Sequence, residues 1–178
     1  MLFSGRSILT MLHGIVFGGV ALMALAAALF AASSMMKPEE GSDVARSERS
    51  RTLAALMAGI AVVLWMTVIS GTYIIFPPYR APPPQGVVDL VQYPRARLLA
   101  NPDTAWLHAF AMECKEHMPW IAAMLATAAG FIGIRYRSVL LTDPLVRRLT
   151  ATLLGICFAL VGFAALLGTF VNKVAPLE

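Results

Sequence analysis

Four long apolar runs divide the sequence, and they restrict the possible folds more than any other feature. They cover residues 8–32, 52–76, 105–134 and 149–171. A helix of about 20 residues crosses the roughly 30 Å apolar core of a bilayer, so each run is long enough to span it. A chain inside lipid must satisfy its backbone groups internally, which favours helices. The sequence therefore predicts an all-α integral membrane protein, a single four-transmembrane-helix bundle in the lipid bilayer.

The first run also has some features of a secretory signal peptide. Arg6 precedes it, and alanines and serines close it at positions 31–34. However, the apolar core of a signal peptide is about 7–15 residues long, and this run is much longer. With 58% hydrophobic residues and a mean hydropathy of +0.73, the whole chain is also too apolar for a soluble domain. We therefore expect residues 8–32 to form the first transmembrane helix.

Two polar connections differ in composition. Residues 33–51 carry many charges and predict a solvent-exposed linker or a short frayed helix. Residues 77–104 are rich in proline and predict a long outer loop. At the end of this loop Asn101 is followed by Pro102 and Asp103, a pattern typical of a capped helix start.

The flanking charges predict an orientation. Eight lysines and arginines lie in the connections after the first and third runs: Lys37, Arg46, Arg49, Arg51, Arg135, Arg137, Arg147 and Arg148. Five lie on the opposite side: Arg6, Arg80, Arg95, Arg97 and Lys173. The positive-inside rule then places both termini and the proline-rich loop outside, in what we expect to be a prokaryotic inner membrane. Because the positive charges lie in these flanks, they do not indicate nucleic-acid binding.

The segment 106–117, WLHAFAMECKEH, carries the densest chemistry of the chain. It places His108, Glu113, Lys115, Glu116 and His117 in a helix that also has to enter the membrane. Ionisable groups at such positions are costly, so they are candidate functional residues. Any site is expected to include part of this segment.

Helical spacing predicts which of these groups act together. Residues at spacings of three and four share a face. One such face contains Trp106, Phe110, Glu113, His117, Trp120 and Met124. His108 and His117 are nine residues apart and point to opposite sides of an ideal helix, although Pro119 is expected to kink the helix near Lys115.

The first functional hypothesis is a small electron-transfer subunit that carries a b-type haem near the outer, periplasmic face. Histidine is a common axial ligand of haem iron. At about 1.5 Å per residue, His13 and His117 lie about 30 Å and 27 Å from the inner ends of their helices. They are the expected ligands, and His108 would replace one of them if the kink at Pro119 rotates the outer turns.

Three further residues are expected beside such a cofactor. Gly14 and Gly18 form a small-residue face that a macrocycle edge or another helix could approach. Tyr73 lies at a similar depth on the second run, and Thr169 does so on the fourth. The sequence thus predicts a polar layer beneath the outer loop.

The sequence leaves other functions open. Glu113 and His117, one turn apart, could exchange a proton with a quinol, with Lys115 and Glu116 supplying nearby charges. A chlorophyll-type pigment would use the same histidine chemistry with one axial ligand. Glu113, His117 and His13 together could hold iron or zinc. The chain could also be a structural or assembly subunit among other membrane or periplasmic subunits, with no chemistry of its own.

Several classes of chemistry are excluded by missing motifs. Cys114 and Cys157 stand apart, without the C-x-x-C-H spacing of c-type haem attachment or a common zinc motif. The chain also lacks the P-loop, H-E-x-x-H and G-x-S-x-G motifs. If the protein takes part in catalysis, we expect it to be a subunit of a membrane oxidoreductase and not a complete enzyme.

Overall fold

A computed structural model describes residues 4–35 and 43–176, and this part of the chain folds as helices joined by short turns and by one longer non-helical segment, residues 81–93. Four helical segments are long and apolar enough to cross a membrane: Gly5–Ser34, Val44–Arg80, Pro102–Arg135 and Pro144–Val174. The predicted four-helix membrane bundle is confirmed. The helices extend beyond the apolar runs at several ends, because polar residues continue the helix outside the hydrocarbon.

Three of the four long helices are divided into shorter elements. The first comprises α1 (Gly5–Met11), η1 (Leu12–Gly18) and α2 (Gly19–Ser34), and the second α3 (Asp43–Ser70), η2 (Gly71–Ile75) and α4 (Phe76–Arg80). The third comprises α6 (Pro102–Trp106), η3 (Leu107–Met112) and α7 (Glu113–Arg135), and the fourth is α9 (Pro144–Val174). Two short helices, α5 (Pro94–Ala100) and α8 (Arg137–Thr142), complete the fold.

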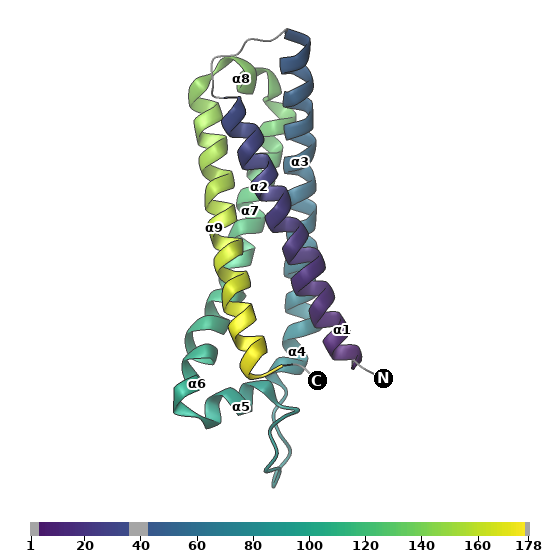
Figure 1. Cartoon of the computed structure of the whole chain (residues 1–178), viewed down its shortest axis with the longest axis vertical. Helices are drawn as coiled ribbons and strands as arrows, with labels where there is room; N and C mark the ends of the chain where they lie inside the picture. Colours follow the sequence, from purple (N-terminus) through teal and green to yellow (C-terminus); the bar gives the residue numbers. More distant parts are fainter. Residues whose placement is uncertain (1–3, 36–42, 177–178) are drawn as a thin grey trace.

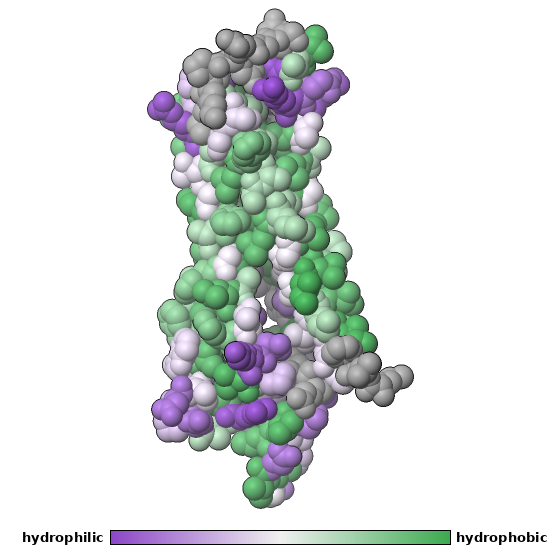
Figure 2. Space-filling model, in the orientation of Figure 1, coloured by the Kyte–Doolittle hydropathy of each residue, from purple (hydrophilic) through white to green (hydrophobic). Residues whose placement is uncertain are grey.

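The long helices alternate in direction, and each packs on two others (Figure 1). The first pairs with the second and fourth, and the third also pairs with the second and fourth. Both chain ends lie beside α4, α5 and α6, and we call this the cap end of the bundle. The opposite end carries α8. Figure 2 shows an apolar belt along the bundle with polar residues gathered toward both ends, as expected for a membrane span.

The tightest helix contact joins α3 and α7. The buried face of α7 is made almost entirely of small residues: Ala122, Ala123, Ala126, Ala129, Gly130 and Gly133. A Cβ atom added at Gly130 would lie 3.5 Å from the carbonyl oxygen of Met57, so the two backbones approach closely. Lipid tails are as apolar as the side chains, so close packing of this kind is what holds membrane helices together.

The glycine face of the first helix behaves differently. A Cβ atom at Gly14 or Gly19 would meet nothing within 4 Å, and one at Gly18 would meet only the His13 carbonyl at 3.6 Å. Among the residues that the structure describes, these glycines therefore make no close contact with another helix. Their predicted packing against a partner helix or a cofactor edge stays a prediction.

The cap end has its own small core. Tyr79, Leu98, Leu107, Met112 and Leu167 are buried there, and they come from α4, α5, η3 and α9. Asn101 caps α6 by accepting a hydrogen bond from the Asp103 N–H at 2.9 Å, which confirms the predicted helix start. The predicted outer loop is thus partly helical, since α4 and α5 lie within it.

Three of the four long helices contain a π-helical segment, and all three segments lie toward the cap end. A π segment inserts a residue into the helix and changes the direction of the side chains that follow, and such segments are frequent at functional sites. The second helix continues through Pro77 and Pro78 because they occupy the first turn of α4, where proline is tolerated. The cap half of the bundle is therefore less regular than the α8 half.

Gly133→Leu should destabilise the bundle, because a Cβ atom there already collides with the Met57 methyl group and lies 3.2 Å from Ala54 Cα. Overpacking of this kind costs about 1–3 kcal/mol. Thermal unfolding in detergent measures it. Gly59→Leu is the control, since a Cβ atom there meets nothing within 4 Å. Equal melting temperatures for the two variants would contradict the close α3–α7 contact.

Candidate functional site

His13 lies in η1 and faces the second helix. Its Nδ1 atom is 3.0 Å from the Ser70 hydroxyl oxygen. In the arrangement in which Ser70 donates its own proton to the Thr67 carbonyl oxygen at 3.1 Å, its hydroxyl oxygen accepts from His13. In that arrangement the imidazole carries its proton on Nδ1 and keeps a lone pair on Nε2. His13 is oriented as a base or a ligand.

Gly71, the first residue of η2, makes room for this ring. A Cβ atom at Gly71 would lie 2.8 Å from His13 Cε1 and 3.3 Å from Nε2. Any side chain at this position would push the imidazole away from Ser70. Ser70 and its sequence neighbour Gly71 together thus fix the position and the tautomer of the His13 ring.

Lys115 extends from α7 across the interior toward α9. A Cβ atom at Gly168 would collide with its Nζ atom, so the ammonium group occupies the space that this glycine leaves. Within residues 4–35 and 43–176 the ammonium has no hydrogen-bond or ion-pair partner, although its charge acts on His13. A cation between membrane helices is costly unless an acceptor or an anion meets it. Lys115 is therefore poised to bind a ligand.

Lys115 and His13 lie at nearly the same depth. Lys115 is about 30 Å from Arg135 along its helix, and His13 is about 31 Å from Ser34. Gly168 is likewise about 30 Å from Arg148. These distances match the thickness of the hydrocarbon, so the three residues lie at its boundary on the cap side.

In Figure 2 a small opening is visible between the parts of the bundle in its lower half, with polar residues beside it. In Figure 1 the first helix and α9 diverge toward the cap end, whereas they lie together near α8.

His108 has a different environment. Its Nε2 atom accepts a hydrogen bond from Arg95 Nε at 3.2 Å, so the ring proton lies on Nδ1. That proton is donated to the Tyr79 hydroxyl oxygen at 2.9 Å. Both nitrogens are thus used within the protein. In this arrangement His108 offers no free lone pair to a cofactor.

The predicted face around His117 points away from the bundle. Trp106 and Phe110 are half exposed, and Glu113, His117 and Met124 are also exposed. His117 donates from Nδ1 to the Glu113 carbonyl oxygen at 2.8 Å, which leaves its Nε2 lone pair free on the outer surface. His13 and His117 are not brought together, since they belong to helices that do not pack on each other.

The other predicted site residues are dispersed. Tyr73 is 69% exposed and Thr169 is exposed, so neither joins a polar layer inside the bundle. Glu116 is half-buried and is acted on by the charges of Arg80 and Arg95 at the cap. In the part of the chain that the structure describes, no group of three His, Cys, Asp or Glu could hold a metal ion.

Several residues of the site were missed at the sequence level. Ser70, Gly71 and Gly168 surround His13 and Lys115, while Tyr79 and Arg95 bind His108. Depth alone could have indicated Ser70 and Gly71, which lie as far along the second helix as His13 lies along the first. Which side of each helix these residues face depends on the packing.

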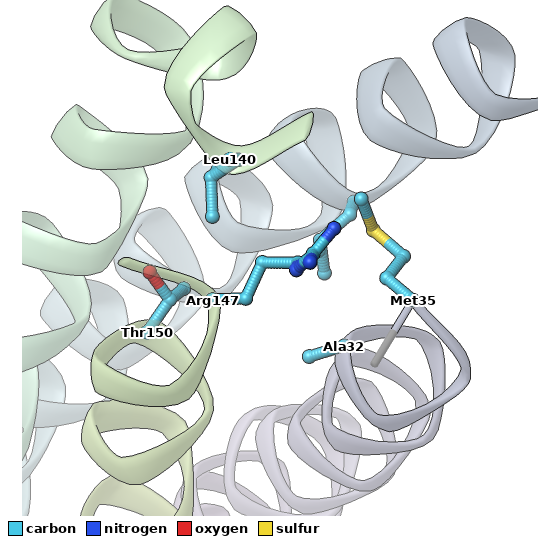
Figure 3. A pocket seen from close by; sticks show the side chains of 6 residues that line it. Ala32, Met35, Leu140, Arg147 and Thr150 are labelled. Carbon is cyan, nitrogen blue, oxygen red and sulfur yellow. The ribbon is translucent and has the colours of Figure 1, made fainter. Parts of the chain in front are cut away.

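Arg147 is the notable polar residue at the α8 end. Its Nη1 atom donates to the Leu141 carbonyl oxygen at 3.2 Å and closes the turn between α8 and α9. Its Nε atom is buried and has no hydrogen-bond partner among the described residues, and Figure 3 shows the side chains around it. The apolar side chains of Ala32, Met35 and Leu140 close around it, so this corner is a structural anchor and not an open site.

Comparisons with protein-family models, with curated proteins and with solved structures gave no match. The function is therefore argued from the chemistry of the site itself.

The hydrogen bonds predict that all three histidines carry their proton on Nδ1 at neutral pH. Nitrogen-15 spectra of histidine-labelled protein distinguish the two neutral tautomers. Single substitutions of His13, His108 and His117 by glutamine assign the three signals, and Ser70→Ala should release the tautomer of His13 alone. A proton on Nε2 of His13 in the unaltered protein would contradict the assignment.

Proposed function

We propose that the protein is a redox subunit of a larger membrane complex and that it binds a quinone head group between Lys115 and His13. The observation that carries the proposal is the ammonium of Lys115, which has no partner in the described chain and whose charge acts on the oriented imidazole of His13. A quinone offers a carbonyl oxygen to a donor such as lysine. A quinol offers a hydroxyl proton to a base such as His13 Nε2.

The two residues have complementary roles in this proposal. Lys115 donates a charge-assisted hydrogen bond to one oxygen of the head group. His13 takes a proton from the quinol, and the imidazolium that results keeps its Nδ1–H bond to Ser70. Oxidation of a quinol releases two protons and two electrons. The two electrons pass one at a time to a one-electron acceptor, a haem on this chain or a haem or iron–sulfur cluster on a partner subunit, and the second proton passes to water at the cap end.

The position of the site suits an amphiphile. The head group would lie at the hydrocarbon boundary, where Lys115 and His13 are about 30 Å from the α8 side. The isoprenoid tail would leave through the space between α1 and α9 into the bilayer. A purely structural subunit would have no need of an interior ammonium facing such an opening.

The orientation of the protein in the membrane is part of the same proposal. Thirteen lysines and arginines flank the helices, with eight on the α8 side and five on the cap side. The positive-inside rule then puts α8 in the cytoplasm and the cap end outside, in a prokaryotic inner membrane. Quinol oxidation at the cap end would release its protons to the outside.

Lys115→Met should weaken quinone binding about 10–100-fold, because it removes a charge-assisted hydrogen bond worth about 1.5–3 kcal/mol. Isothermal titration of the detergent-solubilised protein with a short-tailed ubiquinone measures this effect. Gly168→Ala should also weaken binding, since its Cβ displaces the ammonium group.

Gly162→Ala is the matched control on α9, because its Cβ would meet only Leu22 at 3.8 Å. Its affinity should equal that of the unaltered protein. Equal affinities for all four proteins, or no binding of any quinone, would refute the proposed site.

A b-type haem is the second candidate. His13 keeps Nε2 free while Nδ1 is held by Ser70, which is the usual arrangement of a metal-binding histidine. His13 would be the axial ligand on this chain, and Lys115 could meet a propionate. His117 has the same free Nε2 but faces outward, so it would serve a haem shared with a partner subunit. The haem would supply one-electron transfer.

Optical spectra of the purified protein test the haem candidate. A sharp visible α-band after dithionite reduction should be present if haem is bound, and His13→Ala should abolish or strongly shift it. Glu113→Gln is the control, because it removes only a charge on the exposed face and should leave the band in place. A featureless spectrum from protein isolated with its lipids would exclude the haem.

A further inference from the structure

A cluster at the cap end is not used by the proposed quinone site. His108 in η3 joins Tyr79 of α4 to Arg95 of α5 through two hydrogen bonds of 2.9 Å and 3.2 Å. Tyr79 is only 3% exposed, so the cluster is fixed on one side to the core of the cap. Three elements that are separate in sequence therefore meet at one imidazole.

We infer that His108 is a pH-sensitive latch that holds α5 on the bundle when neutral and releases it when protonated. The inference does not depend on what the Lys115 site binds.

The direction of the switch follows from the donor and acceptor roles. Arginine carries only donors, so the Arg95–His108 bond requires a lone pair on Nε2. Protonation puts a hydrogen on Nε2, and two N–H groups then face each other. The bond is lost and is replaced by repulsion between two cations. The Nδ1–H bond to Tyr79 survives, so His108 stays in place while Arg95 leaves.

The charges around His108 act in both directions. Burial is the largest effect that opposes protonation of His108, Arg95 of α5 and Arg80 of α4 also oppose it, and Glu113 of α7 favours it. α6 and α9 also pack against η3, and in the described chain they bring no charged group that acts on the ring. His108 thus has two positive neighbours and one negative neighbour. When its ring is protonated at acid pH, it repels Arg95.

Two buried residues anchor α5, Pro94 at its start and Leu98 one turn later. The Leu98 carbonyl oxygen also accepts from the Thr104 hydroxyl at 2.9 Å. Arg95 lies between these anchors and is bound by His108. When this bond is lost, α5 keeps both anchors but loses the polar contact between them. The outer loop would loosen without unfolding the bundle.

Hydrogen–deuterium exchange of the full-length protein in detergent tests the latch. Protection factors, which correct for the intrinsic effect of pH on exchange, should fall at least about fivefold for the amides of residues 95–100 between about pH 8 and about pH 4. The amides of α7 beyond Pro119 and of α9 should stay protected at both pH values, which shows that the bundle remains folded.

Three variants distinguish the latch from a general loosening at acid pH. His108→Gln should abolish the pH dependence, whatever its starting protection, because glutamine does not titrate. Arg95→Met should give low protection at both pH values. His117→Gln should behave like the unaltered protein, because His117 lies on the outer face and makes no contact with α5. A pH dependence that survives in His108→Gln, or protection that is equal at both pH values in the unaltered protein, would overturn the inference.

Discussion

Close packing of small residues between α3 and α7 is the interaction on which the rest of the structure depends. In a bilayer, helices gain little from leaving lipid, so they associate where their backbones can approach. Alanines and glycines supply that approach from the α8 end to about the middle of the bundle. Toward the cap end they give way to Lys115, Met112 and the π segments, and the helices diverge. The site that we propose for the quinone lies where these small residues stop.

The polar groups of the cap half are organised by what each can donate or accept. Ser70 gives its proton to Thr67, so His13 must give its own proton to Ser70. Arg95 can only donate, so His108 must accept on Nε2. His13 therefore keeps a free lone pair on Nε2 and can act as a base, whereas His108 uses both ring nitrogens to connect parts of the cap. The difference lies at Nε2, which accepts a hydrogen bond from Arg95 in His108 and has no such donor among the described residues in His13.

The π segments place these groups. His13 lies in η1, Gly71 begins η2 and His108 lies in η3. Each inserted residue rotates the helix beyond it, so the cap half no longer follows the phase of the α8 half. The rotation in the first two helices brings an imidazole against a glycine. In the third helix, His117 beyond η3 is exposed, whereas His108 within η3 is half-buried.

The sequence by itself determined the number of membrane helices, the capped start at Asn101 and the depth of the polar residues, because hydrophobic length, helix rise and capping are properties of the local chain. It also separated His108 from His117, since nine residues on one helix fix their relative direction. Only the tertiary structure decided which way each helix faces. That direction left the glycines of the first helix open, put the small residues of α7 at the main contact, and turned Lys115 inward and His117 outward. It depends on packing between distant segments and on π insertions, which apolar periodicity does not encode.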